Sequence, residues 1–176
     1  FTVNHTRESS EQELLELLLE RLERMGKLGT TTVEVKSGYG LTKESEAKML
    51  KVIKMAKKIT KLDLVANYCG AHSVPKGMNQ DEATEEIIKN HIPYLKELMD
   101  KGEIDPEFID IFAEVGVFEF ENTKKNLAAG KTIGLKGNFH GDEIGFVDSG
   151  KLGFEAEARA ISHLENLNDE GIKLMA

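Results

Sequence analysis

One stretch decides how this chain is interpreted: Asn138-Phe139-His140-Gly141-Asp142-Glu143. It ends a short apolar run that is typical of a β-strand, and it places an imidazole and two carboxylates within four positions. Imidazole and carboxylate groups bind metal ions, and they also move protons to and from bound water. A histidine at a strand end, with acids in the following turn, therefore indicates a candidate metal and proton-transfer site.

The rest of the chain repeats the same unit, a strand followed by a helix. We expect strands over residues 30–35, 62–68, 109–112, 135–139 and 160–162. A leading helix is expected after a capping box at Ser9 or Ser10. Further helices are expected over 42–59, 80–100 with Pro93 kinking or dividing it, 121–133, 146–157 and from Asp169 onward. Such alternation is typical of a parallel sheet with right-handed crossovers. The predicted fold class is α/β, in one domain over residues 1–176.

Polar and aromatic residues gather at the expected strand ends. These positions are Tyr39, His72, Glu114, His140 and His163, and they include three of the five histidines in the chain. In parallel α/β folds, the loops at the carboxyl ends of the strands converge on one edge, where ligands bind. One histidine at a strand end is more often structural than functional, but three of them beside carboxylates favour a site.

Other residues are either structural or open to two interpretations. His91 lies in a charged helical stretch and is expected at the solvated surface. His5 and Arg7 lie in an expected loop over residues 3–7, where each is either functional, with Arg7 as an anion clamp, or a plain surface residue. Glu114 is either a catalytic group or an internal salt-bridge partner. Cys69 is expected to be a buried strand residue without activation.

Composition excludes several functional classes. The net charge of -8 argues against nucleic-acid binding, which needs a basic face. No apolar run approaches the roughly 20 residues that span a bilayer, and no signal peptide is visible. A single cysteine excludes an internal disulfide and favours a reducing cytoplasm. The predicted partner is therefore a small-molecule substrate, with no nucleic acid and no membrane.

Familiar catalytic motifs are absent. The glycine-rich run Ser37-Gly38-Tyr39-Gly40 lacks the lysine and hydroxyl of a phosphate-binding loop, and no Gly-x-Ser-x-Gly elbow occurs. Metal-assisted hydrolysis remains, in which imidazole binds the metal ion and carboxylate or imidazole carries the proton. A catalytic zinc ion needs three protein ligands, and His140 is the one secure ligand in this sequence.

Four segments together resemble the imidazolonepropionase family of the amidohydrolase superfamily. These segments are residues 29–41, 68–75, 138–143 and 160–165, and they occur in the order found in that family. The resemblance implies a (β/α)8 TIM-type barrel, incomplete here and containing strands two to six of eight. It also implies one bound zinc or iron ion and the hydrolytic opening of the imidazolone ring of 4-imidazolone-5-propanoate.

The resemblance also implies roles for individual residues. His140 corresponds to a metal ligand at the end of the fifth barrel strand. Glu143 and His163 correspond to catalytic residues beside the reacting water, and Glu143 also contacts the substrate. Tyr39 and His72 correspond to substrate-binding positions.

The sequence departs from the family pattern in three respects. The family's His-x-His pair and its eighth-strand aspartate are missing, and we expect them upstream of Phe1 and downstream of Ala176 in a larger protein. This chain alone is then expected to be inactive. Residues 144–158, which contain the expected helix over 146–157, also depart from the family pattern. Two alternatives stay open, namely another cyclic amidohydrolase and a non-catalytic α/β binding module. A homodimer is a possible assembly.

Overall fold

Five parallel β-strands form one sheet in the computed structural model, which describes residues 1–176. The strands lie across the sheet in the order in which they occur in the chain. They are β1 (Thr32–Lys36), β2 (Asp63–Ala71), β3 (Phe108–Ala113), β4 (Lys136–Gly141) and β5 (Ala160–His163). Every neighbouring pair is parallel, so the predicted parallel α/β sheet is confirmed.

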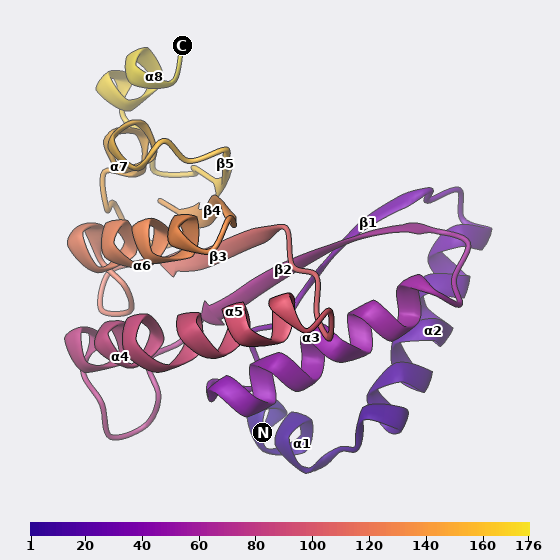
Figure 1. The fold of residues 1–176 in the computed structure, drawn as a ribbon. Coiled ribbons are helices and arrows are strands. Elements are labelled where there is room, and N and C mark those ends of the chain that lie inside the picture. Colours follow the sequence, from indigo (N-terminus) through magenta and orange to yellow (C-terminus); the bar gives the residue numbers. More distant parts are fainter.

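Helices connect the strands, and those between β1 and β5 cover one face of the sheet (Figure 1). The helices are α1 (Thr2–Glu8), α2 (Glu11–Lys27), α3 (Lys43–Lys57), α4 (Gln80–Glu86), the π-helical turn η1 (Ile87–His91), α5 (Ile92–Asp100), α6 (Phe120–Thr132), α7 (Ser149–Ala156) and α8 (Asp169–Met175). The sheet is curled and open, with β1 and β5 at its two edges. This half-barrel confirms the predicted incomplete barrel. None of the helices combines the length and the apolar character needed to cross a membrane.

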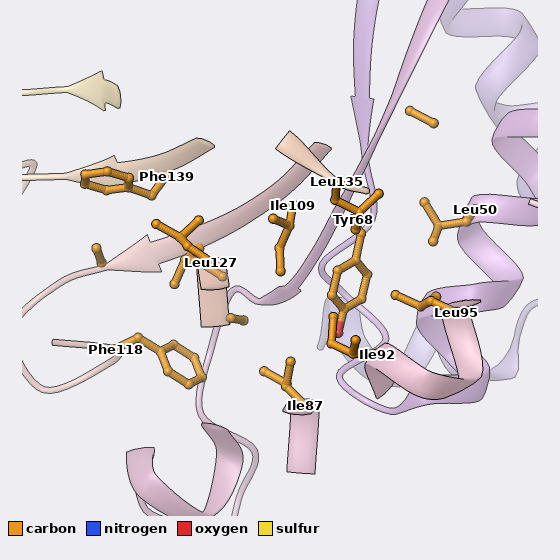
Figure 2. Packing of buried hydrophobic residues seen from close by; sticks show 14 of the residues in the cluster. Leu50, Tyr68, Ile87, Ile92, Leu95, Ile109, Phe118, Leu127, Leu135 and Phe139 are labelled. Carbon is orange, nitrogen blue, oxygen red and sulfur yellow. The ribbon is translucent and has the colours of Figure 1, made fainter. Parts of the chain in front are cut away.

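Buried apolar side chains fill the space between the sheet and its helices (Figure 2). Ile109 and Ile111 of β3 are completely buried there, in the same cluster as Leu127 of α6. Because side chains alternate along a strand, Asp110 and Phe112 of β3 project from the opposite face. The polar and aromatic side chains of β3 therefore lie on the face of the sheet that the helices leave uncovered.

Side-chain caps define where two of the helices begin. Ser10 caps α2 in a capping box, in which its hydroxyl accepts from the Glu13 N–H and the Glu13 carboxylate accepts from the Ser10 N–H. Thr42 caps α3 by accepting from the Ser45 N–H. Both starts agree with the sequence patterns, because capping depends on residues only three positions apart.

The expected loop over residues 3–7 is wrong, because these residues lie in α1. Lys48 of α3 donates through Nζ to the carbonyl oxygens of Thr6 (2.8 Å), Arg7 (3.0 Å) and Ser9 (2.7 Å). An isolated helix of this length is unstable in water. The ammonium group at its carboxyl end supplies a stabilising contact that the local sequence does not reveal.

The expected surface position of His91 is also wrong, because its side chain is buried and 2% exposed. Its Nδ1 atom lies 2.7 Å from the hydroxyl oxygen of Tyr68 on β2. His91 ends the π-helical turn η1, which immediately precedes α5, and Pro93 lies in the first turn of α5. The wider turn replaces regular helical hydrogen bonding where proline lacks an N–H, so the expected division of this helix is confirmed.

The helix α7 begins at Ser149, three residues after the expected start at Phe146. The buried carboxylate of Asp142 accepts from the N–H groups of Val147 (2.7 Å) and Ser149 (3.2 Å). These bonds hold the intervening residues as a loop. The later start lies within the segment that departs from the family pattern.

Candidate functional site

The candidate site lies at the carboxyl ends of the strands, on the face of the sheet that the helices leave uncovered. Tyr39 follows β1, His72 follows β2, His140 lies in β4 and His163 is the last residue of β5. His140 is the register partner of Phe112 on β3. Parallel pairing in chain order therefore brings four segments that are far apart in sequence to one edge.

The aromatic rings of these residues form a row. The ring centroids of Tyr39 and His72 are 4.9 Å apart, and those of His72 and His140 are 6.5 Å apart. The rings of His140 and His163 are stacked, with centroids 5.6 Å apart and an interplanar angle of 26°. The structure thus brings together all four ring-bearing residues that the sequence selects.

Glu143 joins this row next to His163. Its Oε2 atom lies 3.5 Å from Nε2 of His163, and both side chains are about one-third exposed (34% and 33%), which leaves them accessible to a small molecule. His163 Nδ1 lies 3.4 Å from Oε1 of Glu165. The backbone has φ values of 77° at His163 and 73° at Leu164. Such values are strained for residues other than glycine and are typical of functional sites.

His140 is held from behind by a buried carboxylate. Its Nδ1 atom lies 2.9 Å from Oδ1 of Asp110, whose side chain is 1% exposed. The Lys36 ammonium forms an ion pair with the other carboxylate oxygen of Asp110. Burial alone would raise the pKa of Asp110, but the hydrogen bond with His140 and the ion pair with Lys36 outweigh burial and lower this pKa.

The residues present fit a metal ion at one ligand position. The Nδ1 atom of His140 is occupied by Asp110, which leaves Nε2 as the metal-binding atom, and a carboxylate behind a histidine is the usual support for a metal ligand. No group of three or more His, Cys, Asp or Glu side chains in residues 1–176 is arranged to hold a metal ion. Among these residues, His140 is the candidate metal ligand.

A buried carboxylate also shapes the loop that carries Tyr39. Glu46 of α3 is completely buried and accepts from the N–H groups of Gly38 (2.8 Å), Gly40 (2.7 Å) and Leu41 (2.8 Å). Three charge-assisted bonds to one short loop restrict its motion strongly. Glu46 therefore fixes the backbone on both sides of Tyr39.

Glu114 has a matching role on the other side of the site. Its carboxylate is 3% exposed and accepts from the N–H groups of Val115, Ile144 and Gly145, each at 2.9 Å. Both interpretations of Glu114 from the sequence give way to a third, since the carboxylate holds the backbone of two loops. The loop immediately after Glu143 is thereby tied to the end of β3.

Four further residues lie outside the row of rings. His5 is exposed in α1, and His91 is buried among the helices on the covered side of the sheet. Arg7 donates through Nε to the carbonyl oxygen of Gly40 at 2.7 Å, so it ties α1 to the loop after β1. Cys69 is buried as expected, and burial raises the pKa of its thiol.

Sequence reasoning did not select Asp110, Lys36 or Phe112. The Phe112 ring lies between two site histidines, with its centroid 5.9 Å from that of His72 and 6.0 Å from that of His140. A signal was available, because Asp110 is a charged residue flanked by isoleucines in an expected interior strand. Parallel strands are buried on both faces and rarely carry a charge without a partner.

Comparison with known proteins shows similarity along the whole chain. A protein of Dictyostelium discoideum named probable imidazolonepropionase is 54% identical over 177 residues, and a human protein of the same name is 52% identical over 176 residues. Each alignment covers 100% of this chain, which spans 42% and 41% of the two relatives. No family model matches the chain. The resemblance that the four motifs predict is confirmed.

A solved structure supports the fold. The crystal structure of adenine deaminase from Arthrobacter aurescens superimposes with a TM-score of 0.61 over 94% of this chain and 50% of that chain. The sequences are 14% identical, so this likeness concerns the fold.

Proposed function

We propose that this chain is the central part of an imidazolonepropionase, which hydrolyses 4-imidazolone-5-propanoate to N-formimidoyl-L-glutamate in L-histidine degradation. The proposal is carried by the row of Tyr39, His72, His140 and His163 in a chain similar to imidazolonepropionases along its whole length. The reaction hydrolyses a carbon–nitrogen bond of a cyclic amide. We infer a cytoplasmic enzyme, because its unpaired cysteine suits a reducing compartment.

His140 is the residue that would hold the metal ion, through Nε2. One bound zinc or iron ion would supply a Lewis acid that makes water a nucleophile near neutral pH. The remaining ligands come from outside residues 1–176, because this chain contains no further suitable cluster. On this proposal the chain alone has no turnover.

Glu143 and His163 are the proton-carrying residues in this proposal. Their side chains lie 3.5 Å apart, and the His163 ring stacks on that of His140, so both groups can reach a water that attacks the substrate. The Glu143 carboxylate accepts a hydrogen bond from that water and takes its proton. His163 orients the same water and helps to move the proton toward the departing ring nitrogen.

Tyr39 and His72 are the substrate-binding residues. Their rings meet edge to face, with centroids 4.9 Å apart at an angle of 81°. His72 Nδ1 lies 3.1 Å from the carbonyl oxygen of Gly38, so it donates there and leaves Nε2 directed at a ligand. The phenol of Tyr39 and this imidazole would hold the imidazolone ring or its propionate group, and Glu143 would add a contact to the ring.

The decisive experiment is a histidine substitution in the full-length protein. His140→Ala should lose both the metal ion, measured by elemental mass spectrometry, and turnover of imidazolone propionate. Lys61→Ala is the control, because Lys61 is exposed just before β2, at the amino end of the strands and opposite to the candidate site. Stoichiometric metal in His140→Ala would contradict the assignment.

A substrate comparison separates the proposal from the alternative of another cyclic amidohydrolase. The full-length protein should turn over imidazolone propionate with a higher kcat/KM than it shows for other cyclic amides or for ring compounds that could be deaminated. Faster turnover of one of those compounds would reassign the substrate, while loss of activity in His140→Ala would still support the metal site.

A further inference from the structure

We propose that Asp110 and Lys36 form a positioning pair that decides which ring nitrogen of His140 is available to a metal ion. This inference rests on the proposed function, in which His140 is a metal ligand, and adds two residues that neither touch substrate nor bind metal. Its basis is a chain of three side chains on three strands, from Lys36 on β1 through Asp110 on β3 to His140 on β4.

The carboxylate of Asp110 determines the tautomer of His140. A neutral imidazole carries its hydrogen on one ring nitrogen and a lone pair on the other. An ionised carboxylate only accepts hydrogen bonds, so the contact of 2.9 Å between Asp110 Oδ1 and His140 Nδ1 requires hydrogen on Nδ1. The lone pair then lies on Nε2, at the open side of the ring.

The other two side chains that contact Asp110, those of Lys36 and Asn67, are both donors to it. The Lys36 ammonium binds Oδ2 of Asp110, and an ammonium group has no acceptor. The amide nitrogen of Asn67 lies 3.4 Å from the same oxygen, while it donates to Oε1 of Glu34 at 2.6 Å. These surroundings select an acceptor-only group at position 110, and an amide does not satisfy them.

The substitution Asp110→Asn therefore has a chemically specific consequence. The charged Lys36 claims the new amide oxygen, which leaves the amide nitrogen facing His140. An amide nitrogen is a donor, so His140 must accept through Nδ1 and carry its hydrogen on Nε2. The lone pair that would bind the metal ion is then lost from the open side of the ring, although the size of the side chain is preserved.

The first test measures metal affinity by chelator competition in the full-length protein. Loss of such a supporting hydrogen bond weakens metal binding by roughly 10- to 100-fold, and we expect this for Asp110→Asn. Lys36→Met should bind metal more tightly than Asp110→Asn, because Asp110 still accepts from His140. Wild-type affinity in Asp110→Asn would overturn the inference.

The double variant separates tautomer control from a general loss of structure. In Asp110→Asn with Lys36→Met, no ammonium competes for the amide oxygen, which can turn to accept from His140. The double variant should therefore bind metal more tightly than Asp110→Asn alone. A merely structural role predicts equal or weaker binding, and that result would overturn the inference.

The tautomer itself can be observed by ¹⁵N NMR of metal-free, histidine-labelled protein, with the His140 signals assigned by their loss in His140→Ala. The expected hydrogen is on Nδ1 in the wild type and on Nε2 in Asp110→Asn. Hydrogen on Nε2 in the wild type overturns the inference even if the variants do not fold. If the expected tautomers are found but His140→Ala retains its metal, the proposed function fails and the positioning pair stands.

Discussion

Lowering the pH from about 7.5 to about 5 should destabilise this fold by about 2 kcal/mol through His91 alone. Burial among the helices lowers the pKa of His91 from its ordinary 6.5 to about 4. Glu86 and Glu44 oppose this shift by favouring the proton, and Lys43 adds to it. Burial favours the neutral ring, and a hydrogen bond between His91 Nδ1 and the Tyr68 hydroxyl, 2.7 Å apart, satisfies one of its nitrogens.

The magnitude follows from the interval between the two pKa values. In the unfolded chain His91 regains a pKa near 6.5, so between about pH 6.5 and 4 the unfolded state binds more protons than the folded state. Stability is therefore complete above pH 6.5 and falls as the pH falls. Each pH unit in this interval is worth about 1.4 kcal/mol, which gives about 2 kcal/mol at pH 5 and a limit of about 3.4 kcal/mol below pH 4.

The assay compares the wild type with His91→Gln in the full-length protein, by denaturant unfolding followed by circular dichroism at both pH values. Glutamine does not titrate, and its side-chain oxygen can accept from the Tyr68 hydroxyl. Titration of all other groups is common to both proteins and cancels in the difference. The wild type should lose about 2 kcal/mol more than His91→Gln on acidification.

Equal pH dependence of the two proteins would refute this reasoning. It would mean that the folded protein admits the proton without penalty, through water or a rearranged π-helical turn. If acidification instead lowered the unfolding free energy of His91→Gln more than that of the wild type, burial of His91 could not be the cause of the pH dependence.

Two further substitutions test the site and the packing around it. Glu46→Gln should lower the free energy of unfolding by about 2 kcal/mol, because the new amide N–H would face a backbone N–H where a charge-assisted hydrogen bond stood. It should also raise KM, because the loop that carries Tyr39 would be held less firmly. Unchanged stability and KM would show that this loop keeps its conformation without Glu46. Gly150→Ala should lower the melting temperature, because the added methyl carbon would lie 2.3 Å from Cα of Gly171 in α8, at a cost of about 1–3 kcal/mol. Gly26→Ala meets only a flexible leucine side chain and should be tolerated, so equal effects of the two glycine variants would contradict this account.

The alternation of strands and helices could be predicted because it depends on local patterns. Apolar runs, capping residues such as Ser10 and Thr42, and glycine turns act over a few positions, and these decide which elements form. Parallel strands in chain order then place Tyr39, His72, His140 and His163 at one edge. The row of rings follows from the order of elements along the chain.

The errors have a common physical origin. The helix α1 depends on Lys48, which is about 40 positions away in the chain. His91 was expected in solvent because its neighbours are charged, but a π-helical turn and the Tyr68 hydroxyl bring it into the core. Contacts over such separations leave no trace in local periodicity.

The same distinction divides the candidate site. Residue types at strand ends were enough to indicate His140 and His163 with nearby carboxylates and to favour metal-assisted hydrolysis, whereas the choice of Glu143 came from the resemblance to the imidazolonepropionase family. The partner that directs the His140 ring was decided by tertiary structure, because Asp110 and Lys36 are 30 and more positions away from their contacts. Sequence patterns determine which strands form and which residues end them, but strand register and sheet curvature determine which buried donor meets which acceptor, and only the folded chain contains that information.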